Sequence, residues 1–356
     1  MRLGVFLPNW IGDVVMATPA LDSLRELAGP RGRVVGVMRP YVADVVDGLG
    51  LLDRHVFYKP DAKDEALRGR AVIDALREEQ LDGVVLLTNS LRTAWLAYRS
   101  GAGERIGYER DGRSWLLSTR LRDPRRRGRR PPRPQSDSPL TLAYAAGGAW
   151  RAPDLQLATT ADDDRQADEA WARLGLATDL PVVVFNTGGA YGDAKSWPRK
   201  HFAELARRLV DEAPVSVLVN CGPGEREAAG QIAAAVDRRS VVSLGEVEDL
   251  PIGLSKAGIR RSSLLVTTDS GPRFFGIAFG KPVVSLFGPT DPAATRTHYA
   301  AEERLSLTLD CQFCWERSCP LGHHRCMQDL SVDRVLRSVR RAMSIGAPLP
   351  AGGNAA

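Results

Sequence analysis

Residues 264–287 follow the order strand, turn, helix, strand, and this stretch constrains the fold more than any other part of the chain. The apolar run 264–266 is typical of a buried parallel strand. Residues 269–271 are Asp, Ser and Gly, which favour a turn, and Pro272 suits the first turn of a helix that ends at Gly280. Because residues 283–287 are again apolar, the stretch predicts a βαβ unit of a parallel sheet.

The turn of this unit brings a helix N-terminus to the carboxyl edge of the predicted sheet. The first N–H groups of a helix lack helical partners, and with Ser270 and Gly271 they form a candidate phosphate site. An ordinary turn between a strand and a helix explains the same residues equally well. The stretch alone leaves both interpretations open.

The rest of the chain alternates strands and helices in two similar halves. Expected strands are 3–7, 34–38, 55–58, 81–87, 105–108 and 155–157 in the first half, and 181–185, 215–219 and 240–244 in the second. Helical spacing lies between them, as at 64–79. Thr18-Pro19 predicts an N-cap with Pro at N1, and an earlier helix start with a kink at this point is the alternative. We therefore predict an α/β fold with two Rossmann-like domains, each a doubly wound parallel sheet.

The predicted domain boundaries follow from this pattern. We expect a first domain at 1–160, a linker region at 161–180, a second domain at 181–330, a C-terminal helix at 331–345 and a flexible tail at 346–356. The length of 356 residues suits two domains of this size.

Charge and hydropathy exclude several classes of protein. A net charge of +5 over 356 residues is too small to argue for nucleic-acid binding. No apolar run approaches the length of a membrane span, and the first one, 3–7, is too short for a signal peptide. We therefore expect a soluble, cytoplasmic protein. Segment 113–134 is dense in arginine and proline and is predicted to be a loop.

Four motifs in combination resemble one enzyme family, although each alone is weak. They are Asn9-Trp10-Ile11-Gly12-Asp13 with Thr18-Pro19-Ala20-Leu21, Ala190-Tyr191-Gly192-Asp193-Ala194-Lys195-Ser196-Trp197-Pro198, Asp269-Ser270-Gly271-Pro272, and Phe287-Gly288-Pro289-Thr290-Asp291-Pro292. Together they are similar to the ADP-heptose:lipopolysaccharide heptosyltransferases of glycosyltransferase family 9. The cysteine segment 311–326 most resembles the heptosyltransferase II branch. The resemblance runs from Met1 to about Met343.

This resemblance implies a fold, a reaction and a set of partners. The family has the GT-B architecture, in which two Rossmann-like domains face a central cleft. It implies an inverting transferase that moves heptose from ADP-L-glycero-D-manno-heptose to the heptose of the lipopolysaccharide inner core, with no metal and no cofactor. The expected partners are this donor, the inner-core acceptor and a transient contact with the inner leaflet of the cytoplasmic membrane, with no nucleic acid.

Sugar transfer needs a base for the acceptor hydroxyl and stabilisation of the departing diphosphate. Asp13, at the carboxyl end of the first strand, matches the general base of the family. Lys195 matches the lysine that faces the donor phosphates. By position alone, a helix-capping role for Asp13 and an exposed loop position for Lys195 are the more ordinary interpretations.

The resemblance also implies two sets of binding residues. The donor set is Thr187, Gly188, Gly189, Tyr191, Gly192, Glu225, Asp269, Ser270, Gly271 and Arg273, with Glu227 competing with Glu225 for the ribose. The acceptor set is Asn9, Asn89, Ser90, Arg113, Arg120 and Arg122, and a solvated basic loop is the competing interpretation of its arginines. Relatives often carry histidine where this chain has Phe274, and Arg273 is a candidate substitute.

Four of the five cysteines, Cys311, Cys314, Cys319 and Cys326, lie close together in the sequence. In a cytosolic protein this crowding argues against a disulfide framework. The spacing differs from that of paired zinc knuckles, so a metal knuckle and a loop of buried or redox-labile thiols stay open. We predict a structural role without a catalytic metal.

Two other functions compete with heptose transfer. A related transferase that uses another nucleotide sugar or glycan acceptor is kept open by Phe274. A non-catalytic module that binds nucleotide sugars or nucleic acid would use the arginine loop and the cysteines. The presence of both Asp13 and Lys195 argues against the second.

Overall fold

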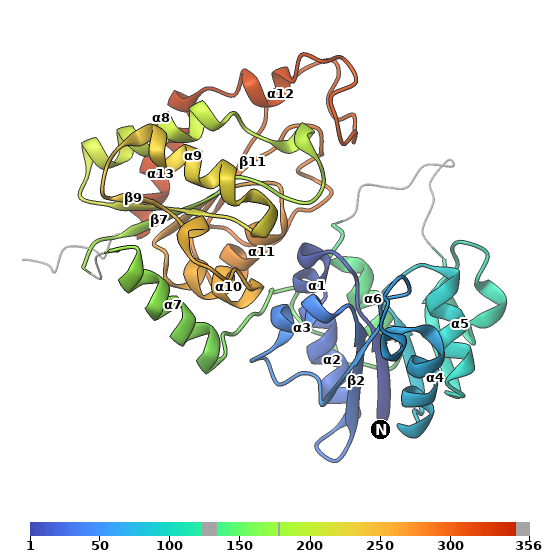
Figure 1. Ribbon diagram of the computed structural model, residues 1–356. Coiled ribbons are helices and arrows are strands. Elements are labelled where there is room, and N and C mark those ends of the chain that lie inside the picture. Colours follow the sequence, from blue (N-terminus) through green and yellow to red (C-terminus); the bar gives the residue numbers. More distant parts are fainter. Residues whose placement is uncertain (123–133, 177–178, 347–356) are drawn as a thin grey trace, which may run out of the picture. The chain divides into compact units, whose positions relative to one another are not determined.

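The computed structural model describes residues 1–122, 134–176 and 179–346. The chain divides into two compact units (Figure 1). The first is Met1–Thr160 with Ala293–His298, and the second is Ala161–Pro292 with the chain from Tyr299 onward. Residues 123–133 of the arginine-rich segment and 347–356 of the predicted tail lie outside the described residues.

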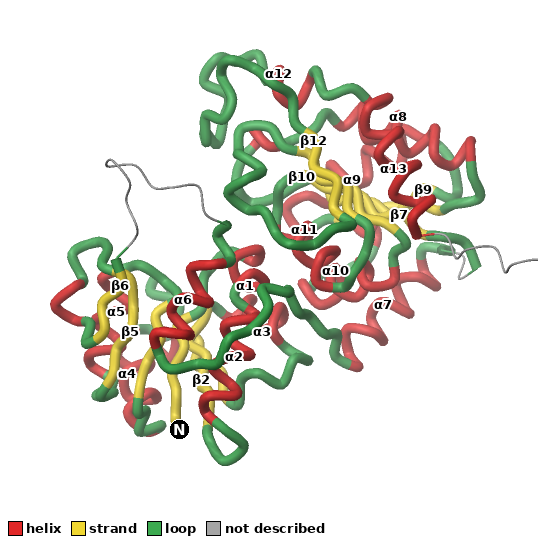
Figure 2. The backbone as a smooth tube through the Cα atoms, turned by 180° about the vertical axis from the view of Figure 1, so that it is seen from behind, coloured by secondary structure: helices red, strands yellow, loops and turns green. Residues whose placement is uncertain are grey.

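The first unit is built on a parallel sheet in the order β3-β2-β1-β4-β5-β6. Its strands are β1 (Arg2–Phe6), β2 (Arg33–Met38), β3 (Arg54–Phe57), β4 (Gly83–Leu86), β5 (Glu104–Tyr108) and β6 (Thr119–Leu121). Its helices are α1 (Ile11–Met16), α2 (Thr18–Ala28), α3 (Pro40–Val46), α4 (Gly69–Glu78), α5 (Leu91–Arg99) and α6 (Asp137–Ala145). In Figures 1 and 2, α2 and α6 pack together on one face and α4 and α5 on the other.

The second unit repeats this plan with the order β12-β11-β10-β7-β8-β9. Its strands are β7 (Val182–Asn186), β8 (Ser216–Asn220), β9 (Val241–Ser243), β10 (Leu264–Thr268), β11 (Val283–Leu286) and β12 (Glu302–Leu305). Its helices are α7 (Ala161–Arg173), α8 (Arg199–Glu212), α9 (Arg226–Val236), α10 (Ile252–Arg261), α11 (Gly271–Ala278), α12 (Arg325–Gln328) and α13 (Val332–Gly346). Helices α8, α9 and α13 cover one face, and α7, α10 and α11 the other.

Strand order fixes where ligands can bind in each sheet. Strand β1 pairs with β2 on one side, in the register Val5 to Gly36, and with β4 on the other, in the register Val5 to Val85. The strands β2 and β3 therefore extend the sheet in one direction from β1, and β4 to β6 extend it in the other. The corresponding change of direction in the second sheet lies between β7 and β10. Doubly wound sheets bind ligands in the crevice beyond the carboxyl ends of these two strands.

The predicted fold class of two doubly wound parallel sheets is confirmed. The continuous apolar strands follow from coverage of both sheet faces, since Val5, Val84 and Val183 are fully buried. Among the described residues, no helix combines the length and apolar character that crossing a bilayer requires.

Three local predictions in the first unit are wrong. Residues 64–79 do not form one helix, because the Asp64 side chain accepts from the Ala66 N–H and starts the separate 3-10 turn Glu65–Leu67. Residues 155–157 form no strand, and the Gln156 N–H instead donates to Thr18 Oγ1 at 3.0 Å. That hydroxyl also donates to Val15 O, so Thr18 does not cap α2.

The arginine-rich segment 113–134, predicted as a loop, has regular structure in its described part. A 3-10 turn at Ser114–Leu116 is followed by β6, which pairs with β5 through Ile106 and Thr119. Burial of Leu116 and Leu117 in the hydrophobic core explains the difference. These two residues hold the segment against the sheet despite its charge.

Candidate functional site

A pocket of ≈ 530 Å³ opens at the crevice of the first sheet. Residues that follow β1 and β4 line it, including Asn9 and Asp13 on one side and Asn89 and Ser90 on the other. Because the carboxyl ends of adjacent parallel strands meet at one edge, residues about eighty positions apart in sequence share this pocket. The structure thus brings together four residues predicted from the sequence.

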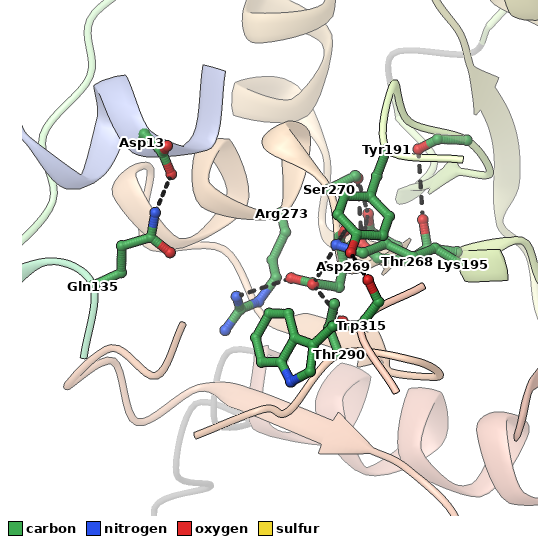
Figure 3. Close-up of polar contacts among 12 residues, drawn as sticks. Asp13, Gln135, Tyr191, Lys195, Thr268, Asp269, Ser270, Arg273, Thr290 and Trp315 are labelled. Atoms are coloured by element: carbon green, nitrogen blue, oxygen red, sulfur yellow. Dashed lines mark hydrogen bonds and ion pairs between the residues drawn. The ribbon is translucent and has the colours of Figure 1, made fainter. Parts of the chain in front are cut away.

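Asp13 lies in the first turn of α1, after the N-cap residue Trp10. Its carboxylate does not cap the helix, but an acidic group in a first turn suits the helix dipole. Gln135 Nε2 donates to Asp13 Oδ1 at 2.8 Å (Figure 3). No sequence signal marks Gln135 as a contact of Asp13, because it lies far along the chain, just before α6.

Arg113 is fully buried, and its guanidinium holds two residues that line the pocket, Thr88 and Asn89. It donates to Tyr108 O at 3.0 Å, to Thr88 O at 2.6 Å and to Asn89 Oδ1 at 3.1 Å. Burial lowers the pKa of Arg113 to about 10, which leaves the group charged at neutral pH. Gly107 leaves room for it, since an added Cβ would meet the guanidinium at 3.2 Å. Arg113 therefore orients Asn89, and its own side chain presents no surface to a ligand.

The other predicted acceptor residues differ in their surroundings. Ser90 is the N-cap of α5, and its hydroxyl accepts from the Thr93 N–H. Arg120 and Arg122 are exposed on and after β6, where Arg122 pairs with Glu109 at 3.0 Å. Neither arginine is among the residues that line the pocket.

In the second unit, the loop after β7 is held by side-chain amides. Asn186 Nδ2 donates to Gly188 O at 3.1 Å and to Ser270 Oγ at 3.0 Å, and Asn220 Nδ2 donates to Asn186 Oδ1 at 2.9 Å. These bonds tie the ends of β7, β8 and β10 together. Asn220 was not singled out from the sequence, because its role depends on strand pairing.

Glycines in this loop make room for close neighbours. A Cβ at Gly188 would lie 1.9 Å from Glu225 Oε1, and one at Gly189 would lie 3.0 Å from the Ser270 Cβ. The other Glu225 carboxylate oxygen accepts from the Gly222 N–H at 3.0 Å. Glu225 therefore packs on the loop itself, whereas Glu227 is exposed on α9 and bonds Gln231. This geometry favours Glu225 over Glu227 as the acid beside a ligand.

Lys195 and Asp269 form an ion pair between the loop after β7 and the end of β10. Lys195 Nζ lies 2.7 Å from Asp269 Oδ2 and 3.0 Å from Asp269 O, and the ammonium sits 4.2 Å from the centre of the Tyr191 ring. Thr290 Oγ1 also donates to Asp269 Oδ2 at 2.7 Å (Figure 3). Lys195 is largely buried, so the interpretation as an ordinary exposed lysine is wrong.

Arg273 is a second buried charge on this side of the second unit. Its guanidinium donates to both carboxylate oxygens of Glu302, at 2.5 and 3.0 Å, and lies 3.6 Å from Asp269 Oδ1. It stacks on the rings of Phe274 and Phe287. Because the side chain is fully buried, Arg273 does not substitute for a ligand-contacting histidine at position 274.

The remaining predicted donor residues surround a helix N-terminus. Ser270 is the N-cap of α11, and Gly271 begins the helix. The Tyr191 hydroxyl donates to Trp315 O at 2.5 Å. Gly192 has φ of 146° and faces Arg317 O, a conformation and a contact that admit only glycine. Thr187 lies half-buried at the start of the loop.

The four clustered cysteines line one small cavity of ≈ 20 Å³ and are all free thiols. The His324 N–H donates to Cys319 Sγ and lowers the pKa of that thiol, whereas burial raises the pKa of Cys326. Within residues 1–122, 134–176 and 179–346, no three His, Cys, Asp or Glu side chains are arranged to hold one metal ion.

Comparison with known proteins agrees with these features. Residues 69–325 match the family model described as glycosyltransferase family 9 (heptosyltransferase). Lipopolysaccharide heptosyltransferase 2 of Escherichia coli K12 is 24% identical over 95% of this chain and 97% of its own length. The solved structure of E. coli ADP-heptose LPS heptosyltransferase II has a TM-score of 0.79 at 22% identity, with 97% of this chain and 99% of that chain covered.

A second solved structure, a glycosyl transferase family 9 protein from Veillonella parvula, has a TM-score of 0.80 at 22% identity, with 97% of each chain covered. These likenesses confirm the predicted GT-B type of fold. The family model covers most of the chain, including Lys195 and Asp269. The chain therefore belongs to glycosyltransferase family 9, the heptosyltransferases.

Proposed function

We propose that this enzyme transfers heptose from ADP-L-glycero-D-manno-heptose to the heptose of the lipopolysaccharide inner core, with inversion of the anomeric centre. The observation that carries this proposal is a carboxylate, Asp13, in the pocket of the first unit, together with Lys195 and a glycine-rich loop at the crevice of the second. The names of the curated relatives supply heptose and lipopolysaccharide, and the name of the solved E. coli structure supplies ADP-heptose.

Asp13 acts as the general base in this proposal. The acceptor hydroxyl binds in the pocket, where Asn9, Asn89 and Ser90 offer polar contacts to a sugar. Asp13 takes the hydroxyl proton as the oxygen attacks the anomeric carbon of the donor. The bond from that carbon to the phosphate oxygen breaks, and ADP leaves with the bonding electron pair. Gln135 donates to one oxygen of Asp13 and fixes the direction of the other.

Lys195 stabilises the departing diphosphate. Its ammonium is held by Asp269 and by the Tyr191 ring, so it is oriented before the donor binds. The N–H groups at the start of α11 and of the glycine loop add partial positive charge. Because these groups carry the charge, we propose that transfer needs no metal ion and no cofactor.

The remaining donor residues contact the phosphates, the ribose or the sugar, or position a residue that does. Thr187, Gly188, Gly189, Gly192, Ser270 and Gly271 offer backbone and hydroxyl contacts to the phosphates, and Glu225 accepts from the ribose hydroxyls. Asp269 is held by Lys195, Thr290 and Arg273 and faces the sugar. Arg273, which presents no surface, positions Asp269 and does not contact the donor.

The proposed partners are the ADP-heptose donor and the lipid-linked inner-core acceptor, without nucleic acid. We propose a cytoplasmic enzyme that contacts the inner face of the cytoplasmic membrane transiently, because its acceptor is anchored there. The exposed Arg120 and Arg122 would contact acidic groups of such an acceptor or of its membrane.

The alternative is a related transferase with another nucleotide sugar, and Phe274 favours it, because the aromatic ring is buried against Arg273 and offers no polar contact. Calorimetry with ADP-, UDP- and GDP-sugars, followed by transfer to an inner-core acceptor that carries one heptose, separates the two. We expect selective binding of ADP-heptose and a product larger by one heptose. Preferred binding of a UDP- or GDP-sugar, or turnover only with another glycan, would reject the proposal.

A further inference from the structure

Helix α5 carries apolar and aromatic side chains on the face that points to solvent. Thr93, Ala94, Leu96 and Ala97 are its buried residues. Leu91, Trp95 and Tyr98, spaced four and three residues apart, each expose at least 40% of their surface. A surface helix normally carries charged and polar residues at such positions. The outer face of α5 therefore exposes one leucine and two aromatic side chains beside two arginines, Arg92 and Arg99.

A fourth exposed side chain joins this face from the neighbouring 3-10 turn. Trp115 is 64% exposed, and its ring centroid lies 6.4 Å from that of Trp95, which lies 5.8 Å from that of Tyr98. The next two residues, Leu116 and Leu117, are buried, so the turn that presents Trp115 is anchored in the core. The aromatic side chains form one cluster on a rigid support.

Arginines border the cluster. The Arg99 guanidinium lies 5.6 Å from the Trp95 ring centre, and that of Arg105 lies 5.6 Å from the Tyr98 ring centre. Arg105 also donates to Leu116 O at 2.8 Å and so fixes the turn that carries Trp115. Residues 91–122 contain seven arginines and three acidic residues. Without the buried Arg113 and the pair of Arg122 with Glu109, five arginines and two acidic residues remain. The surroundings of the cluster are therefore cationic.

We propose that Leu91, Trp95, Tyr98 and Trp115, with Arg99 and Arg105, form a surface that docks onto an anionic lipid bilayer. We call it the α5 aromatic surface. Trp and Tyr rings favour the headgroup region of a bilayer, and arginine beside them binds lipid phosphates. The excess of cations matches an anionic lipid surface.

The position of the surface links it to the pocket. Leu91 directly follows Ser90, and Ser90, Arg92 and Thr93 of the same segment line the pocket. A bilayer bound at α5 would therefore lie beside the pocket that a lipid-linked acceptor has to enter. This part of the argument rests on the proposed function, whereas bilayer binding itself does not require sugar transfer.

Sedimentation with vesicles tests the proposal on the whole protein. Phosphatidylcholine vesicles with and without phosphatidylglycerol, both free of any glycan, measure bilayer binding independently of the enzyme reaction. We expect the protein to sediment with the anionic vesicles and to be released as salt rises. The double variant Trp95→Ser/Trp115→Ser should lower the partition coefficient by about tenfold or more, because two rings leave the interface.

Two further variants keep the test specific. Trp150→Ser, which removes a tryptophan that is 74% exposed after α6, should leave binding unchanged. Arg99→Gln should weaken binding to anionic vesicles by about fivefold and not alter the melting temperature. All these side chains are exposed, so the variants should fold.

Three outcomes would overturn the proposal. They are no binding of the wild type to anionic vesicles at low salt, an equal loss with Trp150→Ser, and tryptophan-dependent self-association seen by light scattering without vesicle binding. The last would assign the surface to contact between copies of the chain. Absence of heptose transfer, with vesicle binding intact, would reject the proposed function and leave this surface assigned.

Discussion

Asp269 connects the charges of the second unit. Its carboxylate accepts from Lys195 Nζ and from Thr290 Oγ1, and its other oxygen lies 3.6 Å from the Arg273 guanidinium. Because the carboxylate is almost fully buried, removal of one partner leaves charge that water cannot easily solvate. Single substitutions here should therefore change both stability and turnover, and the two effects have to be measured separately.

Lys195→Ala tests the role of the ammonium at the diphosphate. We expect kcat to fall by about a hundredfold or more, the usual loss for one such donor, and the affinity for ADP to fall less. Steady-state kinetics with titration of ADP gives both numbers. Lys200→Ala, an exposed lysine of α8, is the matched control and should behave as wild type. A change confined to KM would assign Lys195 to ground-state binding.

Arg113→Lys tests the support behind the pocket. Lysine keeps the charge but cannot make the three directed bonds to Tyr108 O, Thr88 O and Asn89. We expect a loss of about 1–3 kcal/mol in the free energy of unfolding and a raised acceptor KM, with unchanged donor affinity. Arg77→Lys, exposed on α4, should change neither quantity. An unchanged acceptor KM in the folded Arg113→Lys protein would show that Arg113 does not support the acceptor pocket.

At the scale of elements, the loops at the carboxyl ends of the strands hold the site, and close packing fixes their shape. Gly188→Ala should displace the Glu225 carboxylate, because the new Cβ would meet Glu225 Oε1 at 1.9 Å and its nearest neighbours all belong to that side chain. We expect weaker ADP binding by calorimetry, because Glu225 is the proposed acceptor of the ribose hydroxyls, with a loss in the free energy of unfolding below about 1 kcal/mol, since a flexible side chain can move aside. Gly224→Ala, where an added Cβ meets no atom within 4 Å, is the control. Normal ADP affinity of Gly188→Ala would show that the Glu225 carboxylate does not contact the ribose from its place beside this loop.

The cysteine segment makes a prediction about thiol reactivity. Burial raises the pKa of Cys221 to about 11, and the His324 N–H lowers the pKa of Cys319. Alkylation of the folded protein near pH 7 should therefore label Cys319 well before Cys221, as mass spectrometry of timed samples can measure. Between the ordinary thiol pKa of 9.0 and about 11, only unfolded Cys221 ionises, so its contribution to stability is lost as pH rises through this window.

Elemental analysis combined with this alkylation experiment tests whether the cysteine segment binds metal. Elemental analysis of protein purified without added metal should find no stoichiometric metal, in line with our prediction of a structural role for the cysteines. One equivalent of zinc, with all four clustered thiols protected until a chelator removes both metal and activity, would contradict that prediction.

The strands were predictable where they are continuous apolar runs, as at β1, β4, β7 and β10. The edge strands β6 and β12 were missed, because Thr119–Leu121 and Glu302–Leu305 are half-buried and polar. Helix α10 was also missed, although Leu254, Ala257 and Ile259 are buried along it. Edge elements depend on pairing and packing more than on their own composition.

The candidate site was predictable where a motif marks it, or where a residue follows a predicted strand, as Asn89 and Ser90 do. Asp13, Lys195 and the 269–271 turn lie in motifs, and the structure groups them with their expected neighbours within each unit. Gln135 and Asn220 were not predictable, because each contacts a residue far away in sequence. Thr290 lies in a motif, but its hydrogen bond to Asp269 could not be seen from the sequence. The burial of Arg113 and Arg273 was missed for a similar reason. Arginine is rarely buried unless it is paired, and the sequence does not show which residues pair with it.

At the scale of the whole molecule, the two units have different roles in the proposed reaction. The first unit supplies the base and the acceptor pocket, and the second supplies the charges for the nucleotide diphosphate. A change in the first unit should therefore leave donor binding intact, because the donor residues belong to the other sheet. Donor binding and proton removal should therefore be separable by mutation.

Asp13→Asn tests whether the first unit supplies the base without contributing to donor binding. Asparagine keeps the shape of the side chain, and its Oδ1 can still accept from Gln135, but it cannot take a proton from the acceptor hydroxyl. Turnover, affinity for ADP-heptose and melting temperature are measured on this single variant. The account predicts normal melting and normal donor affinity with kcat lowered by about 10²–10⁴, and turnover close to that of the wild type would contradict it.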